Sequence, residues 1–163
     1  MKQEKFLTIY AVLDEETQGI LTNLQNQIIK NYPNGKQTMG IPFHISLGSF
    51  PIECEQELIE RMKEAVSIES FSIEVDGISS FNQQVIFAKP IRNEKLVELH
   101  NMFNGNYADG FSWVPHITLY MGTEEEGQEI LNCLPDFHLV PKIVGLELGE
   151  FFPTRIIFNT KLR

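Results

Sequence analysis

The sequence predicts one domain of mixed helices and strands that is built from two similar halves. Its 163 residues suit a single domain of ordinary size. Short stretches with strand-like alternation are interleaved with stretches of helical periodicity along the whole chain. A motif of histidine, apolar residue, hydroxyl residue and apolar residue occurs at 44–47 and again at 116–119. We therefore expect residues 1–163 to form one domain with an internal repeat.

The pattern of the first half indicates strand, helix, strand, helix and strand, with the first motif on the middle strand. Phe6 to Leu13 alternates as a strand, and Asp14 is placed to cap a helix over 15–31. A second helix is predicted over 53–66 and a further strand over 71–75. The expected buried stripe of the first helix consists of Ile20, Leu21, Leu24 and Ile28.

The second half repeats this order around the second motif. Residues 85–89 predict a strand and 93–103 a helix. Thr123 begins a stretch with capping-box spacing, which predicts the start of another helix. The last strands are expected from 137 to 144 or on to 151, and from 155 to 160.

Similar segments recur at a near-constant offset, which indicates an internal duplication. Asn34-Gly35 and Asn104-Gly105 are 70 residues apart, His44 and His116 are 72 apart, and Val85-Ile86-Phe87 precedes Ile156-Ile157-Phe158 by 71. We place the repeat halves at about 1–84 and 85–163, and we expect the lobes to exchange strands near 80–90. A pseudo-two-fold axis between the halves would bring both motif strands into one cleft.

The paired motifs indicate a phosphate site with two imidazoles. In a strand, His44 and Ser46 share one face, and His116 and Thr118 do the same. Two imidazoles suit a metal as well as acid–base chemistry, but the hydroxyls beside them donate hydrogen bonds and therefore suit phosphate oxygens better than a cation. In-line displacement at phosphorus places the nucleophile and the leaving oxygen on opposite sides, so a base and an acid on two related strands fit it. An ordinary imidazole pKa near 6.5 would leave one ring neutral and the other protonated around neutrality.

Charge and composition limit the partners. The formal net charge of −9 works against extended nucleic acid, whose binding rests on many Lys and Arg contacts to phosphates. A small cyclic-phosphate nucleotide or a short oligonucleotide, held by a few local donors, stays compatible with that charge. No apolar stretch approaches the roughly 20 residues that cross a bilayer, and Cys54 and Cys133 lack metal-ligand or redox spacing. We expect a cytoplasmic monomer with no metal, no cofactor and no membrane contact.

The motifs His44-Ile45-Ser46-Leu47 and His116-Ile117-Thr118-Leu119, the second preceded by Pro115, resemble those of the 2H phosphoesterase superfamily, in its 2′-5′ RNA ligase-like and cyclic phosphodiesterase branch. The resemblance implies a bilobal α+β fold with two antiparallel sheets lining a central cleft and helices on the outside. It also implies metal-independent opening of a 2′,3′- or 1″,2″-cyclic phosphate, or action on a short 2′-5′-linked nucleotide.

By position, the resemblance makes His44 and His116 the general acid and base, while Ser46 and Thr118 hold the phosphate. Which histidine is the acid stays open at this point. Two alternatives to a hydrolase also stay open: a non-catalytic module that binds a small phosphorylated or nucleotide ligand, and an RNA 2′-5′ ligase.

Three other residues are candidates for substrate binding. Tyr10 and Tyr120 could stack on a base, although aromatic residues on strands usually serve packing. Arg155 could face the phosphate, with a solvated strand-end charge as the alternative. Lys36 and Tyr107, in the loops ahead of the motifs, are expected at the rim of the cleft.

Overall fold

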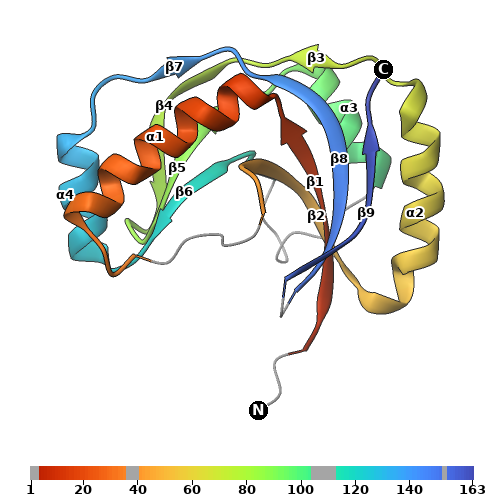
Figure 1. The fold of residues 1–163 in the computed structure, drawn as a ribbon, viewed down its shortest axis with the longest axis horizontal. Coiled ribbons are helices and arrows are strands. Elements are labelled where there is room, and N and C mark those ends of the chain that lie inside the picture. Colours follow the sequence, from red (N-terminus) through yellow and green to blue (C-terminus); the bar gives the residue numbers. More distant parts are fainter. Residues whose placement is uncertain (1–3, 36–40, 104–112, 152–153) are drawn as a thin grey trace.

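The computed structural model describes residues 4–35, 41–103, 113–151 and 154–163, which form an α+β fold with two antiparallel sheets (Figure 1). The strands are β1 (Phe6–Leu13), β2 (His44–Pro51), β3 (Phe71–Ser72), β4 (Val75–Phe81), β5 (Val85–Pro90), β6 (Ile117–Met121), β7 (His138–Leu139), β8 (Lys142–Phe151) and β9 (Arg155–Lys161). The helices are α1 (Glu15–Asn31), α2 (Glu55–Glu64), α3 (Glu94–Phe103) and α4 (Glu124–Cys133). Lys36, Asn104, Gly105 and Tyr107 lie outside the described residues.

Each sheet combines strands from both halves of the chain. The first sheet has the order β2-β1-β8-β3, with β9 also paired to β8, and the second has the order β6-β5-β4-β7. The chain passes from the first sheet to the second at 73–74, after β3, and returns at 140–141, between β7 and β8, so neither crossing lies near 80–90 as predicted. The physical reason lies in a two-residue hairpin turn: Asn82 and Gln83 both have positive φ, which joins β4 directly to β5 within one sheet.

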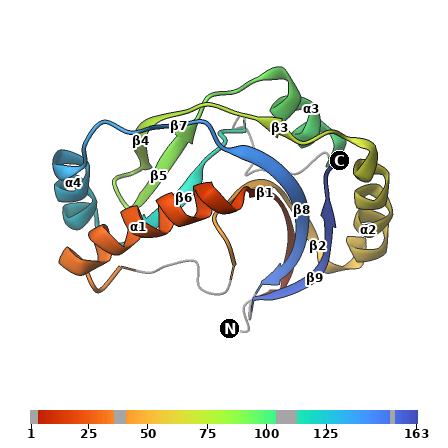
Figure 2. The ribbon, with the colours of Figure 1, turned by 45° about the horizontal axis from the view of Figure 1, so that its top comes forward.

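Helices cover the outer sides of the two sheets. Figures 1 and 2 show α2 and α3 beside the first sheet, with α2 packed on β8 and β9 and α3 on β2. On the other side of the molecule α4 packs against β4 and β5, and α1 lies along β6. The motif strands β2 and β6 are the edge strands of their sheets and contact each other. This places the two motifs at the junction of the lobes.

Helix α1 has the predicted ends, but its buried face differs from the predicted stripe. Asp14 caps it, accepting from the backbone N–H of Thr17 at 3.2 Å and of Lys142 at 2.7 Å. Thr17 is buried together with Leu21, Leu24 and Ile28, whereas Ile20 is 38% exposed. The Thr17 hydroxyl donates to the Asp14 carboxylate, so this polar residue joins the buried face because its hydroxyl is paired.

Two other predicted elements are interrupted. The predicted helix 53–66 is α2 flanked by 3₁₀ turns at Ile52–Cys54 and Ala65–Ser67. The predicted strand from 137 onward is divided into β7 and β8 at residues 140–141, where Pro141 lacks the N–H that a continuous ladder needs. Among the described residues, no helix combines the length and the apolar composition that crossing a bilayer requires.

Candidate active site

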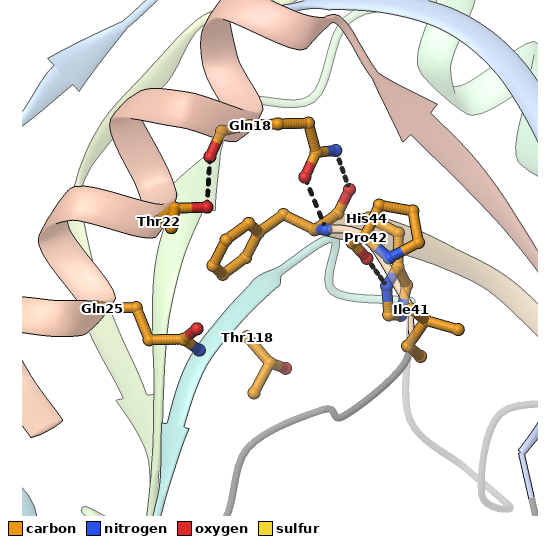
Figure 3. Close-up of a pocket in the computed structure, with 8 residues that line it drawn as sticks. Gln18, Thr22, Gln25, Ile41, Pro42, His44 and Thr118 are labelled. Atoms are coloured by element: carbon orange, nitrogen blue, oxygen red, sulfur yellow. Dashed lines mark hydrogen bonds between the residues drawn. The ribbon is translucent and has the colours of Figure 1, made fainter.

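One residue of each motif, His44 and Thr118, lines a shared cavity, whereas His116 and Ser46, which were expected in the same cleft, are not among its lining residues. The cavity has a volume of about 190 Å³ and lies between α1 and the motif strands (Figure 3). His44 reaches it from the start of β2, and Thr118 reaches it from β6. The residues that line it are Gln18, Thr22, Gln25, Ile41, Pro42, Phe43, His44 and Thr118.

Both motif histidines are held in the same way by the backbone two residues upstream. Nδ1 of His44 lies 2.8 Å from the carbonyl oxygen of Pro42, and Nδ1 of His116 lies 2.8 Å from that of Val114. A carbonyl only accepts, so each Nδ1 carries a proton and donates it. Nε2 is then the nitrogen that gains or loses a proton on each ring, which is what a paired acid and base require.

Burial keeps both imidazoles neutral over a wide range of pH. Desolvation lowers the pKa of His44 to about 4, opposed by its hydrogen bond to Pro42 and assisted by the nearby positive charge of His116. Burial also lowers the pKa of His116 below its usual value of 6.5, again opposed by a backbone hydrogen bond, here to Val114. The pH range in which one ring is neutral and the other protonated therefore lies below neutrality, not around it as the sequence suggested.

Aromatic rings lie against each histidine, and in each half one of these rings comes from the strand that pairs with the motif strand. The ring of Tyr10 on β1 lies 4.5 Å from that of His44, measured between centroids. His116 has Phe81 at 5.0 Å and Phe87 at 5.6 Å, both in edge-on geometry. Such contacts restrict the orientation of each imidazole ring beyond what one hydrogen bond achieves.

Each motif ends in a β-bulge at its fourth residue. Between β1 and β2 the register moves from Gly48 to Ser46, which leaves Leu47 without a partner. Between β5 and β6 it moves from Tyr120 to Thr118, which leaves Leu119 without a partner. A bulge bends the strand and increases its twist, so both motif strands turn directly after the hydroxyl residue.

The two hydroxyl residues differ in their surroundings. Thr118 is partly buried and lines the cavity, and its hydroxyl makes no hydrogen bond within the described part of the chain. Ser46 is partly buried on β2, and its backbone carbonyl accepts from Nε1 of Trp113 at 3.1 Å. Trp113 precedes the second motif, so this bond joins the two motif segments directly.

The described ranges contain neither clustered metal ligands nor paired thiols. Within them, no group of three or more His, Cys, Asp or Glu side chains is arranged to hold a metal ion. Cys54 and Cys133 are both free thiols.

Comparison with known proteins identifies the family. The model of the 2′-5′ RNA ligase superfamily matches residues 33–139, which include both histidine motifs. The chain belongs to the 2′-5′ RNA ligase superfamily. This confirms the resemblance to the 2H phosphoesterases that the motifs indicated. No match was found among curated proteins.

Solved structures of similar fold cover nearly the whole chain of this superfamily member. TT0787 of Thermus thermophilus has a TM-score of 0.69 and 18% identity, over 97% of this chain and 98% of that one. Escherichia coli LigT complexed with 3′-AMP has a TM-score of 0.66 and 15% identity, over 98% and 99%. LigT complexed with phosphate has a TM-score of 0.64 and 15% identity, over the same shares. These similarities confirm the predicted α+β fold.

Tyr120 does not present a ring for a base, contrary to the prediction. It is fully buried, its ring lies edge-on to Tyr32, and its hydroxyl donates to Glu126. The Cβ atoms of alanines at Gly35 and Gly122 would fall within 2.5 Å of the Tyr120 ring or hydroxyl, so these two loops close over it. The reason is the bulge at Leu119, after which the strand no longer presents alternate residues as a regular strand does.

Tyr10 and Arg155 also depart from their predicted roles. Tyr10 is fully buried beneath His44, so its ring supports the histidine and leaves no free face for a base. Burial and the neighbouring Glu147 carboxylate raise the pKa of its hydroxyl. The Arg155 side chain is 64% exposed and lies 3.5 Å from the Glu150 carboxylate at the start of β9, which is the solvated charge that the sequence left as an alternative.

Sequence reasoning missed Gln18 and Gln25 of α1, which line the cavity. They are seven residues apart and therefore lie on one face of the helix. The available signal was two polar residues at that spacing beside the buried stripe of the helix. The neighbouring sequence does not indicate whether such residues face solvent or pack against another part of the fold.

Proposed function

We propose that this protein is a metal-independent phosphodiesterase that opens a 2′,3′- or 1″,2″-cyclic phosphate or cleaves a short 2′-5′-linked nucleotide. The observation that carries the proposal is the matched pair of imidazoles, each with Nδ1 bound to the carbonyl two residues before it. Superfamily membership supports an enzyme of this kind.

In the proposed reaction His44 is the general base and His116 the general acid. His44 has the strongly lowered pKa, so it is the neutral ring when the pair holds one proton. Nε2 of His44 takes a proton from water as the water oxygen forms a bond to phosphorus. The bond from phosphorus to one ribose oxygen breaks, and Nε2 of His116 gives its proton to that oxygen. One water is consumed and one phosphate monoester is formed.

Ser46 and Thr118 are proposed to donate to the non-bridging phosphate oxygens. Each lies two residues after its histidine in the chain, Ser46 within β2 and Thr118 within β6. Hydroxyl donors placed in advance stabilise the charge that shifts to these oxygens in the transition state. The same residues in a protein without turnover would form a phosphate-binding module, which is the alternative.

The ligands of a structural relative are consistent with a small nucleotide substrate. LigT has been solved with 3′-AMP and with phosphate. A ligand of this size needs few cationic contacts, which agrees with the net charge of −9 in the present chain. We propose a small cyclic-phosphate nucleotide or short oligonucleotide as the substrate, acted on by a monomer in the cytoplasm.

The test is turnover of a panel of cyclic phosphates in EDTA. The protein is incubated with 2′,3′-cyclic nucleotides, a 1″,2″-cyclic phosphate and 2′-5′ dinucleotides, and the products are separated by ion-exchange chromatography. We expect one monophosphate isomer, and we expect His44→Ala to form none above background. Binding of these ligands without turnover would support the non-catalytic module instead. Loss of activity in EDTA with recovery on adding a divalent metal would identify a metal-dependent hydrolase, and joining of RNA ends would identify a ligase.

A further inference from the structure

One face of α1 carries two glutamines that bind the backbone of both motif segments. Nε2 of Gln18 donates to the carbonyl of Phe43 at 2.7 Å, and the N–H of Phe43 donates to Oε1 of Gln18 at 2.8 Å. Nε2 of Gln25 donates to the carbonyl of Leu119 at 2.8 Å. Phe43 directly precedes His44, and Leu119 directly follows Thr118.

The contact of Gln18 continues a strand ladder past its end. The last pair of the β1–β2 register joins Val12 to His44, so Phe43 lies one residue beyond it. The Gln18 amide supplies both a donor and an acceptor to Phe43, as a neighbouring strand residue would (Figure 3). Since Nδ1 of His44 binds the carbonyl of Pro42, the glutamine and the imidazole together restrain residues 42–44.

The contact of Gln25 falls on the bulge of the second motif. Leu119 is the residue that the β5–β6 register leaves without a partner. Its neighbour Thr118 lines the cavity across from His44. A hydrogen bond at this carbonyl restrains the bend of β6 at the point that aims the Thr118 side chain.

A single helix therefore ties together strands of two different sheets. β2 belongs to the first sheet and β6 to the second, and no ladder joins them. Residues seven apart in a helix are separated by about 10 Å along its axis, and an α-helix holds this spacing rigidly. α1 is itself fixed to β8, because the carboxylate of its cap Asp14 accepts from the N–H of Lys142.

We propose that Gln18 and Gln25 are positioning residues that set the separation of His44 from Thr118 across the junction of the lobes. This inference rests on the proposed function, and it adds two residues that act on the active site without contacting the substrate. Both polar atoms of the Gln18 amide are engaged by Phe43, which favours a positioning role over a ligand contact. A small shift in the placement of reacting groups is enough to lower a rate by about a hundredfold.

The test compares Gln18→Met, Gln25→Met and the double variant with Gln27→Met, in which an exposed glutamine of the same helix receives the same change. We expect kcat on a cyclic phosphate to fall about 10- to 100-fold in each single variant with KM changed less than about threefold. The double variant should lose little more than the worse single variant, because both bonds set one separation. Gln27→Met should match the wild type. A purely structural role would lower the melting temperature and leave kcat at 25 °C unchanged, and that result would overturn the proposal.

A second measurement separates this proposal from the proposed function. Histidine ring signals are titrated by NMR, and the affinity for inorganic phosphate is measured in the wild type and each variant. We expect the pKa values of His44 and His116 to move and phosphate binding to weaken in the Gln18 and Gln25 variants. If the wild type hydrolyses no substrate, the proposed function fails, and unchanged histidine pKa values with unchanged phosphate affinity would then overturn the positioning role as well. Should a Met variant not fold, Gln18→Glu and Gln25→Glu replace it, since they keep the shape and remove the N–H donors.

Discussion

Tyr10 and Phe87 hold equivalent places behind the two motifs. Tyr10 on β1 pairs in register with Ser46 on β2, and Phe87 on β5 pairs in register with Thr118 on β6. The ring of each lies against the histidine of its own half. The halves differ in polarity at this position, because Tyr10 carries a buried hydroxyl beside Glu147 where Phe87 carries none.

This equivalence predicts that Tyr10→Phe will keep activity. The ring that supports His44 remains, and the hydroxyl that is removed is buried beside the Glu147 carboxylate and does not line the cavity. We expect kcat and KM on a cyclic phosphate within about threefold of the wild type, while Tyr10→Ala should lose activity with the ring support. A rise in KM of tenfold or more in Tyr10→Phe would restore the substrate-binding role first predicted for Tyr10.

The pH profile of hydrolysis should be bell-shaped with its maximum on the acidic side. Activity requires His44 neutral and His116 protonated, so kcat/KM should fall below about pH 4 as His44 gains a proton. It should also fall as His116 loses its proton, at a pH below 6.5. The negative charge of a bound substrate raises both pKa values, so the maximum of kcat should lie at higher pH than that of kcat/KM. A rate that rises steadily from pH 5 to 9 would contradict the pair.

The two histidines should be distinguishable by the leaving group. Replacing either with Ala should cost about 10² to 10⁴ in rate on a cyclic phosphate, and the double variant should lose little more. The leaving group of a p-nitrophenyl phosphodiester is p-nitrophenolate, which departs without being protonated. His116→Ala should therefore lose much less activity on this substrate than His44→Ala. Equal losses on both substrates in both variants would argue against the assignment of acid and base.

The hydrogen-bond donor of Thr118 should matter more for kcat than the β-branched shape of its side chain. Thr118→Val keeps the β-branched side chain and removes the donor, which should lower kcat by about 10² to 10³. Ser46→Ala should behave similarly, and Ser46→Thr should be tolerated because the donor survives and strands accept β-branching. If the Thr118→Val variant folds and its kcat and KM stay close to the wild-type values, the second motif does not hold the phosphate.

Two helical glycines provide a matched test of the packing. A Cβ on Gly127 of α4 would lie 1.6 Å from the backbone oxygen of Gln83 in the β4–β5 turn, whereas a Cβ on Gly19 of α1 would meet nothing within 4 Å. We expect Gly127→Ala to lower the free energy of unfolding by on the order of 1–3 kcal/mol. Gly19→Ala should raise it by up to about 1 kcal/mol through helix propensity. Urea denaturation measures both, and equal effects would show that α4 does not pack on this turn as described.

The sequence by itself determined the elements and the pairing of the motifs. The ends of α1, the cap at Asp14 and the alternation of His44 with Ser46 depend on neighbours a few residues away, so periodicity was sufficient to predict them. The near-constant offset between repeats likewise predicted that two distant histidines would serve one cleft. The family match over 33–139 confirmed the superfamily that those motifs indicated.

Only the tertiary structure decided how exposed each candidate is and what it contacts. Tyr10 and Tyr120 lie on strands as predicted, yet both are fully buried, because burial is set by elements far away in the chain. The bulges at Leu47 and Leu119 depend on how two strands pair, and the bonds from Gln18 and Gln25 depend on where α1 lies against both sheets. The low pKa of His44 has the same origin, since desolvation is the combined effect of everything packed around the ring.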